Sequence, residues 1–177
     1  STAKLTAMKR IFLLLLALLP LLVGAQHTMF RPAQEWTDTE GRHINAHGGC
    51  LLQVGDTWYW YGEHRPYRGF TTEQGVVAYR SHDLMNWTPC GVVLAVNEAA
   101  GSPIERGCIM ERPKVVFNAS TGKYVMLFHL ELKGRGYAAA QVGFAVSDSP
   151  TGPFTFLRAL RPNEGRWPTE TRQKDIE

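Results

Sequence analysis

A carboxylate and two cations stand next to one another at the start of an apolar segment. The sequence reads Glu111, Arg112, Pro113, Lys114 and then continues into Val115, Val116 and Phe117. Charge at the mouth of a buried strand costs free energy unless it is paired or used in binding or catalysis. Glu111 is therefore the first candidate for acid–base chemistry, and a structural ion pair is the alternative. Arg112 and Lys114 are candidates to hold it ionised or to bind a polar ligand.

A similar layout occurs earlier in the chain. Residues 45–49 read Asn-Ala-His-Gly-Gly and precede an apolar run, a Gly55-Asp56 turn and an aromatic run over 58–61 that ends in Gly62-Glu63. Two strand–turn–strand units carry polar groups at comparable ends. This pattern predicts a repeated architecture around a polar centre.

Glu63 is the second candidate carboxylate. It ends an aromatic strand, so we expect it to be buried beside Trp60 and Tyr61, and burial raises the pKa of a carboxyl group towards that of a proton donor. The alternatives are a carboxylate that binds a ligand hydroxyl or a loop amide, and a purely structural group. Tyr61 could stack on a ligand, although most aromatic side chains on such strands form the core.

Two histidines are candidates for the same polar centre. His47 lies between small residues, where a backbone or a ligand can approach closely. His129 ends an apolar run at the position that Glu63 holds in the first unit, so we expect it to face the site. A satisfied structural histidine is the alternative for both. His43 and His47 are four residues apart, but nothing predicts a helix there, so no metal pair is expected.

The pattern after residue 25 is typical of an all-β fold. Short apolar and aromatic runs alternate with Gly, Asp, Asn and Pro clusters. We expect strands near 48–54, 57–62, 75–80 and 91–95, and a second set near 113–117, 123–129, 140–146 and 154–160.

The two sets of expected strands align at a constant spacing. Ser81 and Ser147 are 66 residues apart, and Gly55 and Gly122 are 67 apart. Four strands per unit at a fixed period predict the blades of a β-propeller. A two-sheet sandwich is the alternative, but it would not require the same elements to recur in the same order.

At about 65 residues per blade, the chain would hold roughly two blades and the start of a third, while propellers usually have 4–8. We therefore expect residues 26–177 to be the N-terminal part of a longer, truncated propeller. Its open blade edges would favour self-association.

The first 25 residues have the pattern of a signal peptide, with extra sequence over 1–7 before Met8. Lys9 and Arg10 precede an apolar run over 11–23, and a Val-Gly-Ala segment at 23–25 suits cleavage. The alternative, a membrane anchor, would need a longer apolar run. We expect a secreted or periplasmic protein with no membrane segment after cleavage.

Net charge excludes one class of partner. Residues 1–25 contain three of the 19 basic residues and none of the 16 acidic ones, so the remaining chain is neutral. No nucleic-acid partner is expected. The three cysteines, Cys50, Cys90 and Cys108, form no Cys-x-x-Cys motif and are best interpreted as small buried residues.

Several motifs in order resemble glycoside hydrolase family 43, and most closely its exo-β-1,3-galactanase-like branch. The resemblance runs from about residue 36 to 162 and rests on these segments: Trp-Thr-Asp at 36–38, Ile-Asn-Ala-His-Gly-Gly at 44–49, Trp-Tyr-Gly-Glu at 60–63, Ser-His-Asp-Leu-Met-Asn-Trp at 81–87, Glu-Arg-Pro-Lys-Val at 111–115, Lys-Tyr-Val-Met at 123–126 and Ser-Asp-Ser-Pro-Thr-Gly-Pro-Phe at 147–154. It implies a five-bladed β-propeller.

The chain departs from the wider family at two places. Where that family has an Asp-Pro whose Asp is the general base, this chain has Ala46-His47-Gly48. Where it has Trp-Ala-Pro-Asp, this chain has Glu-Arg-Pro-Lys at 111–114. The galactanase-like branch resembles this chain at both places.

The resemblance implies hydrolysis of galactan or arabinogalactan side chains, with an oligosaccharide or polysaccharide as substrate. Glu111 and Glu63 would be the catalytic carboxylates, and other catalytic groups would come from later blades. The substrate would be bound by Asn45, His47, Tyr61, Arg112, Lys114 and His129. No cofactor or catalytic metal is implied, and a structural calcium ion in the channel stays open. The rival interpretation is a glycan-binding propeller without activity, or an inactive remnant.

Overall fold

The computed structural model describes residues 26–66, 69 and 71–162. The expected signal peptide at 1–25, and residues 163–177 at the expected start of a third blade, lie outside the described residues. The described part contains two four-stranded antiparallel sheets. The first comprises β1 (His47–Val54), β2 (Thr57–Glu63), β3 (Gly75–Ser81) and β4 (Thr88–Ala95); the second comprises β5 (Ile109–Asn118), β6 (Lys123–Glu131), β7 (Gln141–Ser147) and β8 (Thr155–Leu160).

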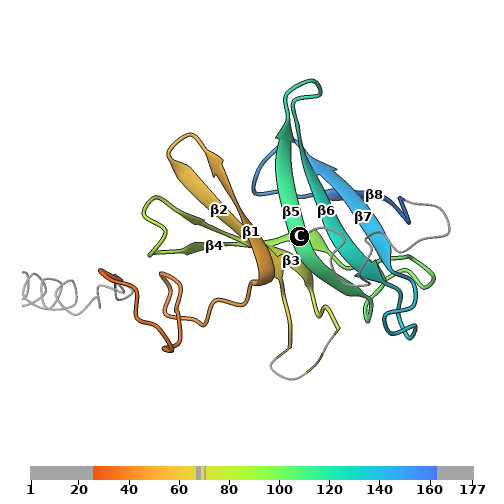
Figure 1. Ribbon diagram of the computed structural model, residues 1–177, viewed down its shortest axis with the longest axis horizontal. Helices are drawn as coiled ribbons and strands as arrows, with labels where there is room; N and C mark the ends of the chain where they lie inside the picture. Colours follow the sequence, from red (N-terminus) through yellow and green to blue (C-terminus); the bar gives the residue numbers. More distant parts are fainter. Residues whose placement is uncertain (1–25, 67–68, 70, 163–177) are drawn as a thin grey trace, which may run out of the picture.

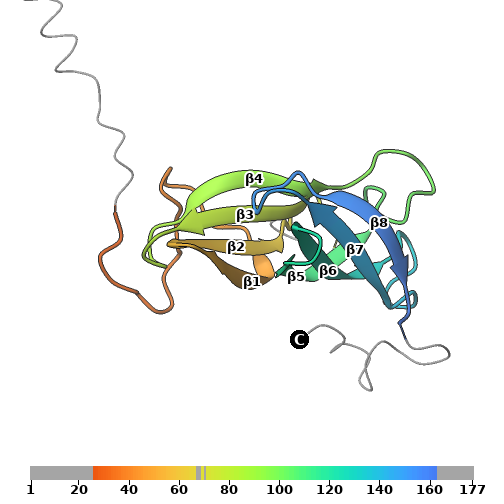
Figure 2. The same cartoon turned by 90° about the horizontal axis from the view of Figure 1, so that it is seen from above.

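The strand order in each sheet follows the order in the chain, β1-β2-β3-β4 and β5-β6-β7-β8. Figure 1 shows the two sheets next to one another, with β1 and β5 as the neighbouring strands of the pair. Seen from above in Figure 2, the sheets are strongly twisted and meet along these strands. All eight strands lie where the sequence predicts them, within a few residues.

The largest difference from the predicted boundaries is the start of β5. The sequence analysis placed the start of this strand near residue 113. The strand in fact begins at Ile109 and continues past Pro113 through a β-bulge between Glu111 and Lys114. The bulge leaves the proline out of the regular pairing, so the strand does not have to end there.

The aromatic strand β2 has two faces, because successive side chains on a strand point to opposite sides. Tyr59 and Tyr61 face the core between the sheets. Trp58 and Trp60 face the other way, into a smaller cluster around the buried Trp87. This division explains why almost every residue of β2 is apolar.

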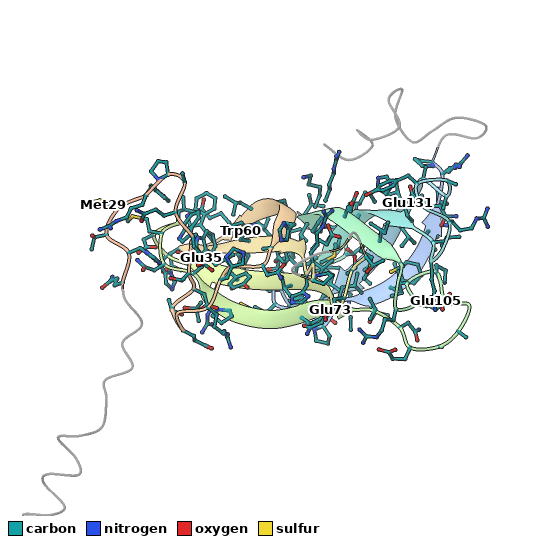
Figure 3. The ribbon with its side chains drawn as sticks, turned by 90° about the horizontal axis from the view of Figure 1, so that it is seen from below. Met29, Glu35, Trp60, Glu73, Glu105 and Glu131 are labelled. Atoms are coloured by element: carbon teal, nitrogen blue, oxygen red, sulfur yellow. The ribbon has the colours of Figure 1, made fainter. Side chains whose placement is uncertain are left out.

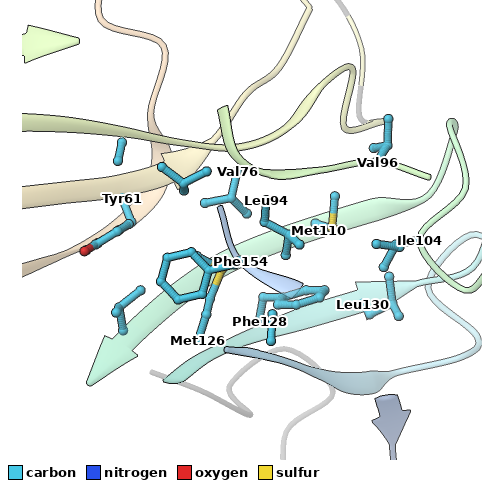
Figure 4. Close-up of a cluster of buried hydrophobic side chains, with 14 of the residues drawn as sticks. Tyr61, Val76, Leu94, Val96, Ile104, Met110, Met126, Phe128, Leu130 and Phe154 are labelled. Carbon is cyan, nitrogen blue, oxygen red and sulfur yellow. The ribbon is translucent and has the colours of Figure 1, made fainter. Parts of the chain in front are cut away.

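The main core lies between the two sheets. Figure 4 shows Tyr61, Val76 and Leu94 from the first sheet packing on Met126 and Phe128 of the second. Two hydrogen bonds fasten the contact at its edge. The Tyr61 hydroxyl donates to the Pro150 carbonyl at 2.6 Å, and the Phe154 amide donates to the Val93 carbonyl at 2.6 Å.

The described residues contain no helix that is long and apolar enough to span a bilayer. All three cysteines are free thiols, and burial raises the pKa of each. Cys108 is fully buried, whereas Cys50 and Cys90 are half-buried. Self-association through blade edges stays a prediction.

Removing the Tyr61 hydroxyl should weaken the contact between the sheets. We expect Tyr61→Phe to lower the free energy of unfolding by about 1 kcal/mol, because the Pro150 carbonyl loses its donor while the ring stays in place. Tyr59→Phe is the matched control, since Tyr59 lies on the same face of β2 and, among the described residues, its hydroxyl makes no hydrogen bond. Urea unfolding of both variants measures the difference. Equal effects would show that the hydrogen bond does not hold the sheets together.

Candidate active site

Glu63 of the first sheet and Glu111 of the second meet around one guanidinium. Arg65, two residues after β2, places its Nε 2.9 Å from Glu63 Oε2 and its Nη2 2.6 Å from Glu111 Oε1. Glu63 is 1% exposed and Glu111 7%. The structure thus brings together the two carboxylates that the sequence singled out, and a cation that the sequence analysis missed joins them.

A repeated bulge aims the inner strands at this point. In β1 the register changes between His47, opposite Glu63, and Cys50. In β5 it changes in the same way between Glu111, opposite His129, and Lys114. Each bulge re-aims the side chains beside it, as bulges do next to active sites.

The two bulges touch one another. Each contains one left-handed residue, Gly48 with φ 55° and Arg112 with φ 50°. A Cβ on Gly48 would lie 3.4 Å from Arg112 Cγ, which is van der Waals contact, so glycine suits this position mainly because of its left-handed backbone. A left-handed backbone is uncommon for arginine and marks a locally strained position.

Asn45 holds the backbone of Arg65. Its side-chain amide donates to the Arg65 carbonyl at 2.6 Å and accepts the Arg65 amide at 3.0 Å. These two bonds use both the Nδ2 and the Oδ1 atoms of Asn45, so Asn45 positions the backbone of Arg65 and does not itself line the cavity.

Tyr137 completes the set of donors around Glu111. Its hydroxyl donates to Glu111 Oε1 at 2.5 Å, and its ring packs edge-on against His129 at 5.8 Å between centroids. Burial, and then the hydrogen bond to Glu111, raises the pKa of the Tyr137 hydroxyl above its ordinary value. The hydroxyl therefore stays a donor at neutral pH.

These side chains surround a polar cavity of about 180 Å³. It is lined by Gly48, Glu63, Arg65, Glu111, Arg112, His129 and Tyr137. A larger hollow of about 560 Å³ lies between residues 26–36 and Met85, but the buried carboxylates do not reach it. The smaller cavity is the candidate active site because the paired charges converge there.

The buried environment of Glu63 changes its pKa. Burial raises the pKa of Glu63 to about 7, and the charge of Arg65 opposes that shift only in part. Thr72 adds a long hydrogen bond to Glu63 Oε1 at 3.4 Å. Glu63 therefore titrates near neutral pH, as expected for a carboxylate at the end of an aromatic strand.

The other predicted site residues are placed as follows. Glu63, Glu111, Arg112 and His129 line the cavity, and Asn45 lies behind it. His47 is exposed at the start of β1 and does not line the cavity, and partial burial and the charge of Arg65 lower its pKa.

Two further predicted residues lie away from the cavity. Lys114 is half-buried beyond the bulge of β5. Tyr61 is fully buried between the sheets, so its ring offers no face to a ligand in the described structure.

Sequence reasoning missed Arg65 and Tyr137. Arg65 had a signal, since a cation two residues after a strand-ending carboxylate can fold back to pair with it. Tyr137 had only a weak one, because it lies in a loop with Gly134 and Gly136 and no strand pattern places it. Within the described ranges, no three His, Cys, Asp or Glu side chains are grouped so as to hold a metal ion.

Comparison with solved structures identifies the fold and the family. The chain is 56% identical to a β-1,3-galactosidase of glycoside hydrolase family 43, solved with galactodeoxynojirimycin, over 73% of this chain and 37% of that one, with a TM-score of 0.72. It is 40% identical to an exo-β-1,3-galactanase from Phanerochaete chrysosporium, solved with galactose, over 73% of this chain and 29% of that one, with a TM-score of 0.67.

A third structure agrees with these two. An exo-β-1,3-galactanase from Clostridium thermocellum is 44% identical over 73% of this chain and 27% of that one, with a TM-score of 0.66. The chain belongs to glycoside hydrolase family 43. The two sheets are accordingly two blades of a five-bladed β-propeller, as predicted, and not the halves of a sandwich.

The family 43 chain spans about a third of the length of these structures. No family model matches it, and no curated protein matches it. The resemblance expected from the ordered motifs is confirmed by the solved structures.

The pKa of Glu63 makes stability depend on pH in a defined direction. The folded value of about 7 lies above the ordinary value of 4.5. Between these values the folded state keeps a proton that the unfolded state has lost, so the free energy of unfolding falls as pH rises through this window. Glu63→Gln removes that titration. The stability of the variant relative to the wild type should then rise by about 3 kcal/mol between pH 4.5 and 7.

Denaturant unfolding at several pH values checks this. Glu98→Gln is the matched control, because Glu98 is exposed and the hydrogen bond from Arg106 lowers its pKa, so it should not reproduce the slope. A constant difference between Glu63→Gln and the wild type across the window would contradict the raised pKa.

Proposed function

We propose that the protein to which this chain belongs hydrolyses β-1,3-linked galactose from galactan or arabinogalactan side chains. The observation that carries the proposal is the pair of buried carboxylates held by Arg65 at an open cavity. The names of the similar structures support the substrate class. They are β-1,3-galactosidases and exo-β-1,3-galactanases, and two of those cited were solved with galactodeoxynojirimycin or galactose.

We do not assign Glu63 and Glu111 as the two opposed carboxyl groups of an inverting glycosidase. Such groups stand roughly 6.5–9.5 Å apart, with the sugar and a water between them. Here both carboxylates are instead bound to the same guanidinium, Glu63 through Nε and Glu111 through Nη2 of Arg65. We therefore assign both to one side of the sugar and expect the opposing group to come from another blade.

Glu111 is the carboxylate assigned to face the sugar. Both of its donors in the described structure, Arg65 and Tyr137, contact Oε1, which leaves Oε2 for the ligand. A charged carboxylate here would stabilise the positive charge that develops on the sugar ring in the transition state.

Glu63 acts on the sugar only through Arg65. It is the more deeply buried of the two, and it contacts Nε of the guanidinium, whereas Glu111 contacts Nη2. Loss or gain of its proton near pH 7 changes how strongly Arg65 is drawn towards Glu111. We assign Glu63 the role of tuning the charge of the Arg65–Glu111 pair.

The rival is a glycan-binding propeller without activity, and a secreted or periplasmic location fits either function. The buried carboxylates favour the enzyme, because a carboxyl group with a raised pKa at a cavity, as Glu63 has, is typical of catalytic sites. The two functions differ in one measurable respect: a binding protein holds galactan without releasing galactose.

Glu111→Gln should separate the two functions. Glutamine keeps the shape and an acceptor oxygen but removes the charge, so we expect kcat for galactose release from β-1,3-galactan to fall roughly 10²–10³-fold. Affinity for galactan should fall much less. The assay uses the full-length protein, with Glu98→Gln, an exposed carboxylate paired with Arg106, as control. Wild-type activity with no effect of Glu111→Gln would refute the role of Glu111, and binding without any wild-type hydrolysis would favour the rival.

A further inference from the structure

A third buried carboxylate lies next to the cavity residue His129, two residues farther along β6. Glu131 is fully buried. Its Oε1 lies 2.7 Å from His129 Nε2, and its Oε2 accepts the backbone amides of Ala139 at 2.9 Å and Ala140 at 3.0 Å. Residues two apart on a strand share a face, so Glu131 supports His129 from the same side of the sheet.

The contact with Glu131 determines where His129 carries its proton. A carboxylate can only accept hydrogen bonds, so the proton must be on Nε2 of the histidine. In the neutral ring the other nitrogen, Nδ1, is then an acceptor. His129 lines the cavity, and none of the described residues bonds to its Nδ1.

Glu131 also fixes the loop that carries Tyr137. This loop, residues 132–140, joins β6 to β7, and it ends at Ala140 in a left-handed conformation with φ 44°. Such a conformation costs about 1 kcal/mol or more in a residue other than glycine. The hydrogen bonds from the Ala139 and Ala140 amides to Glu131 offset that cost. Tyr137, three residues earlier, is thereby held against Glu111.

We propose that Glu131 is a positioning residue of the active site. It holds His129 with the proton on Nε2, so that Nδ1 accepts a hydrogen bond from a hydroxyl of the bound sugar, and it holds the loop that presents the Tyr137 hydroxyl. The Glu131 side chain thus determines whether His129 presents an acceptor to the cavity, and it also determines the position of Tyr137. The sugar contact rests on the proposed function; the placement of the proton does not.

The variant Glu131→Gln separates this role from simple anchoring. Glutamine has one acceptor oxygen and an NH₂ donor. Its oxygen can keep the two amide bonds of the loop, in which case the NH₂ group faces His129 Nε2 and turns that nitrogen into an acceptor. The proton then moves to Nδ1. The loop is kept, while the nitrogen that faces the cavity changes from acceptor to donor.

The proton is located by nitrogen NMR of the full-length protein labelled with ¹⁵N-histidine. We expect Nε2–H in the wild type and Nδ1–H in Glu131→Gln. Galactose should shift the Nδ1 signal in the wild type, a readout that needs no variant. Its affinity, measured by calorimetry, should fall about tenfold in Glu131→Gln because one hydrogen bond to the ligand is lost.

Glu105→Gln is the matched control. The Glu105 carboxylate accepts a hydrogen bond from Lys133 at 3.2 Å, at the start of the same loop, but it does not line the cavity. Figure 3 shows Glu131 on the second sheet and Glu105 in the loop that leads into β5. The control should change neither the His129 signals nor galactose affinity.

Three results would overturn the proposal. They are an Nδ1 proton in the wild type, an Nε2 proton that stays in place in Glu131→Gln, and a proton that moves without any change in galactose affinity. A wild type that binds no galactose would refute the proposed function and the sugar contact of His129. The NMR result would still decide whether Glu131 sets the proton position.

Discussion

The ion pairs of Arg65 are the interaction on which the site depends. Two carboxylates with 1% and 7% exposure would repel one another and lose much of their hydration if they were left alone. A single guanidinium compensates both, and it reaches one from each sheet. Arg65 therefore both links the two blades and neutralises the charge of the site. Its guanidinium must be placed accurately enough to contact both carboxylates at once.

That position is built from the backbone outward. Asn45 fixes the Arg65 main chain, and Gly48 adopts the left-handed backbone of the β1 bulge. On the other side, Thr72 lies between the blades: its hydroxyl accepts the Met110 amide at 2.8 Å and lies 3.4 Å from Glu63. The Arg65 side chain is long and flexible, so its position depends on the turn and bulge that fix the backbone around it.

The sequence was sufficient for the fold and for the two carboxylates, and insufficient for what connects them. Burial of one face of a strand produces a local, periodic pattern of apolar residues. Strands β1 to β8 could therefore be predicted from the sequence. The same reasoning found Glu63 and Glu111, because charge beside an apolar strand is conspicuous. Arg65 and Tyr137 were missed because they lie in loops, where their roles depend on how two sheets pack. Tyr61 was predicted to bind a ligand, but its ring is buried in the core between the blades. The periodicity of the sequence does not show how the two sheets pack, so it could not distinguish these two roles.

The repeat explains how one blade geometry can build an asymmetric site. In the first blade the residue pair at the bulge is His47 on the inner strand and Glu63 on the next; in the second it is Glu111 on the inner strand and His129 on the next. The acid and the histidine have exchanged strands while the backbone register stayed the same. A simple repetition would have set two acids or two histidines at equivalent positions around the channel. The exchange instead brings Glu63 and Glu111 onto one guanidinium and lets His129 contact Glu131, so that the repeated backbone places unlike groups around the cavity.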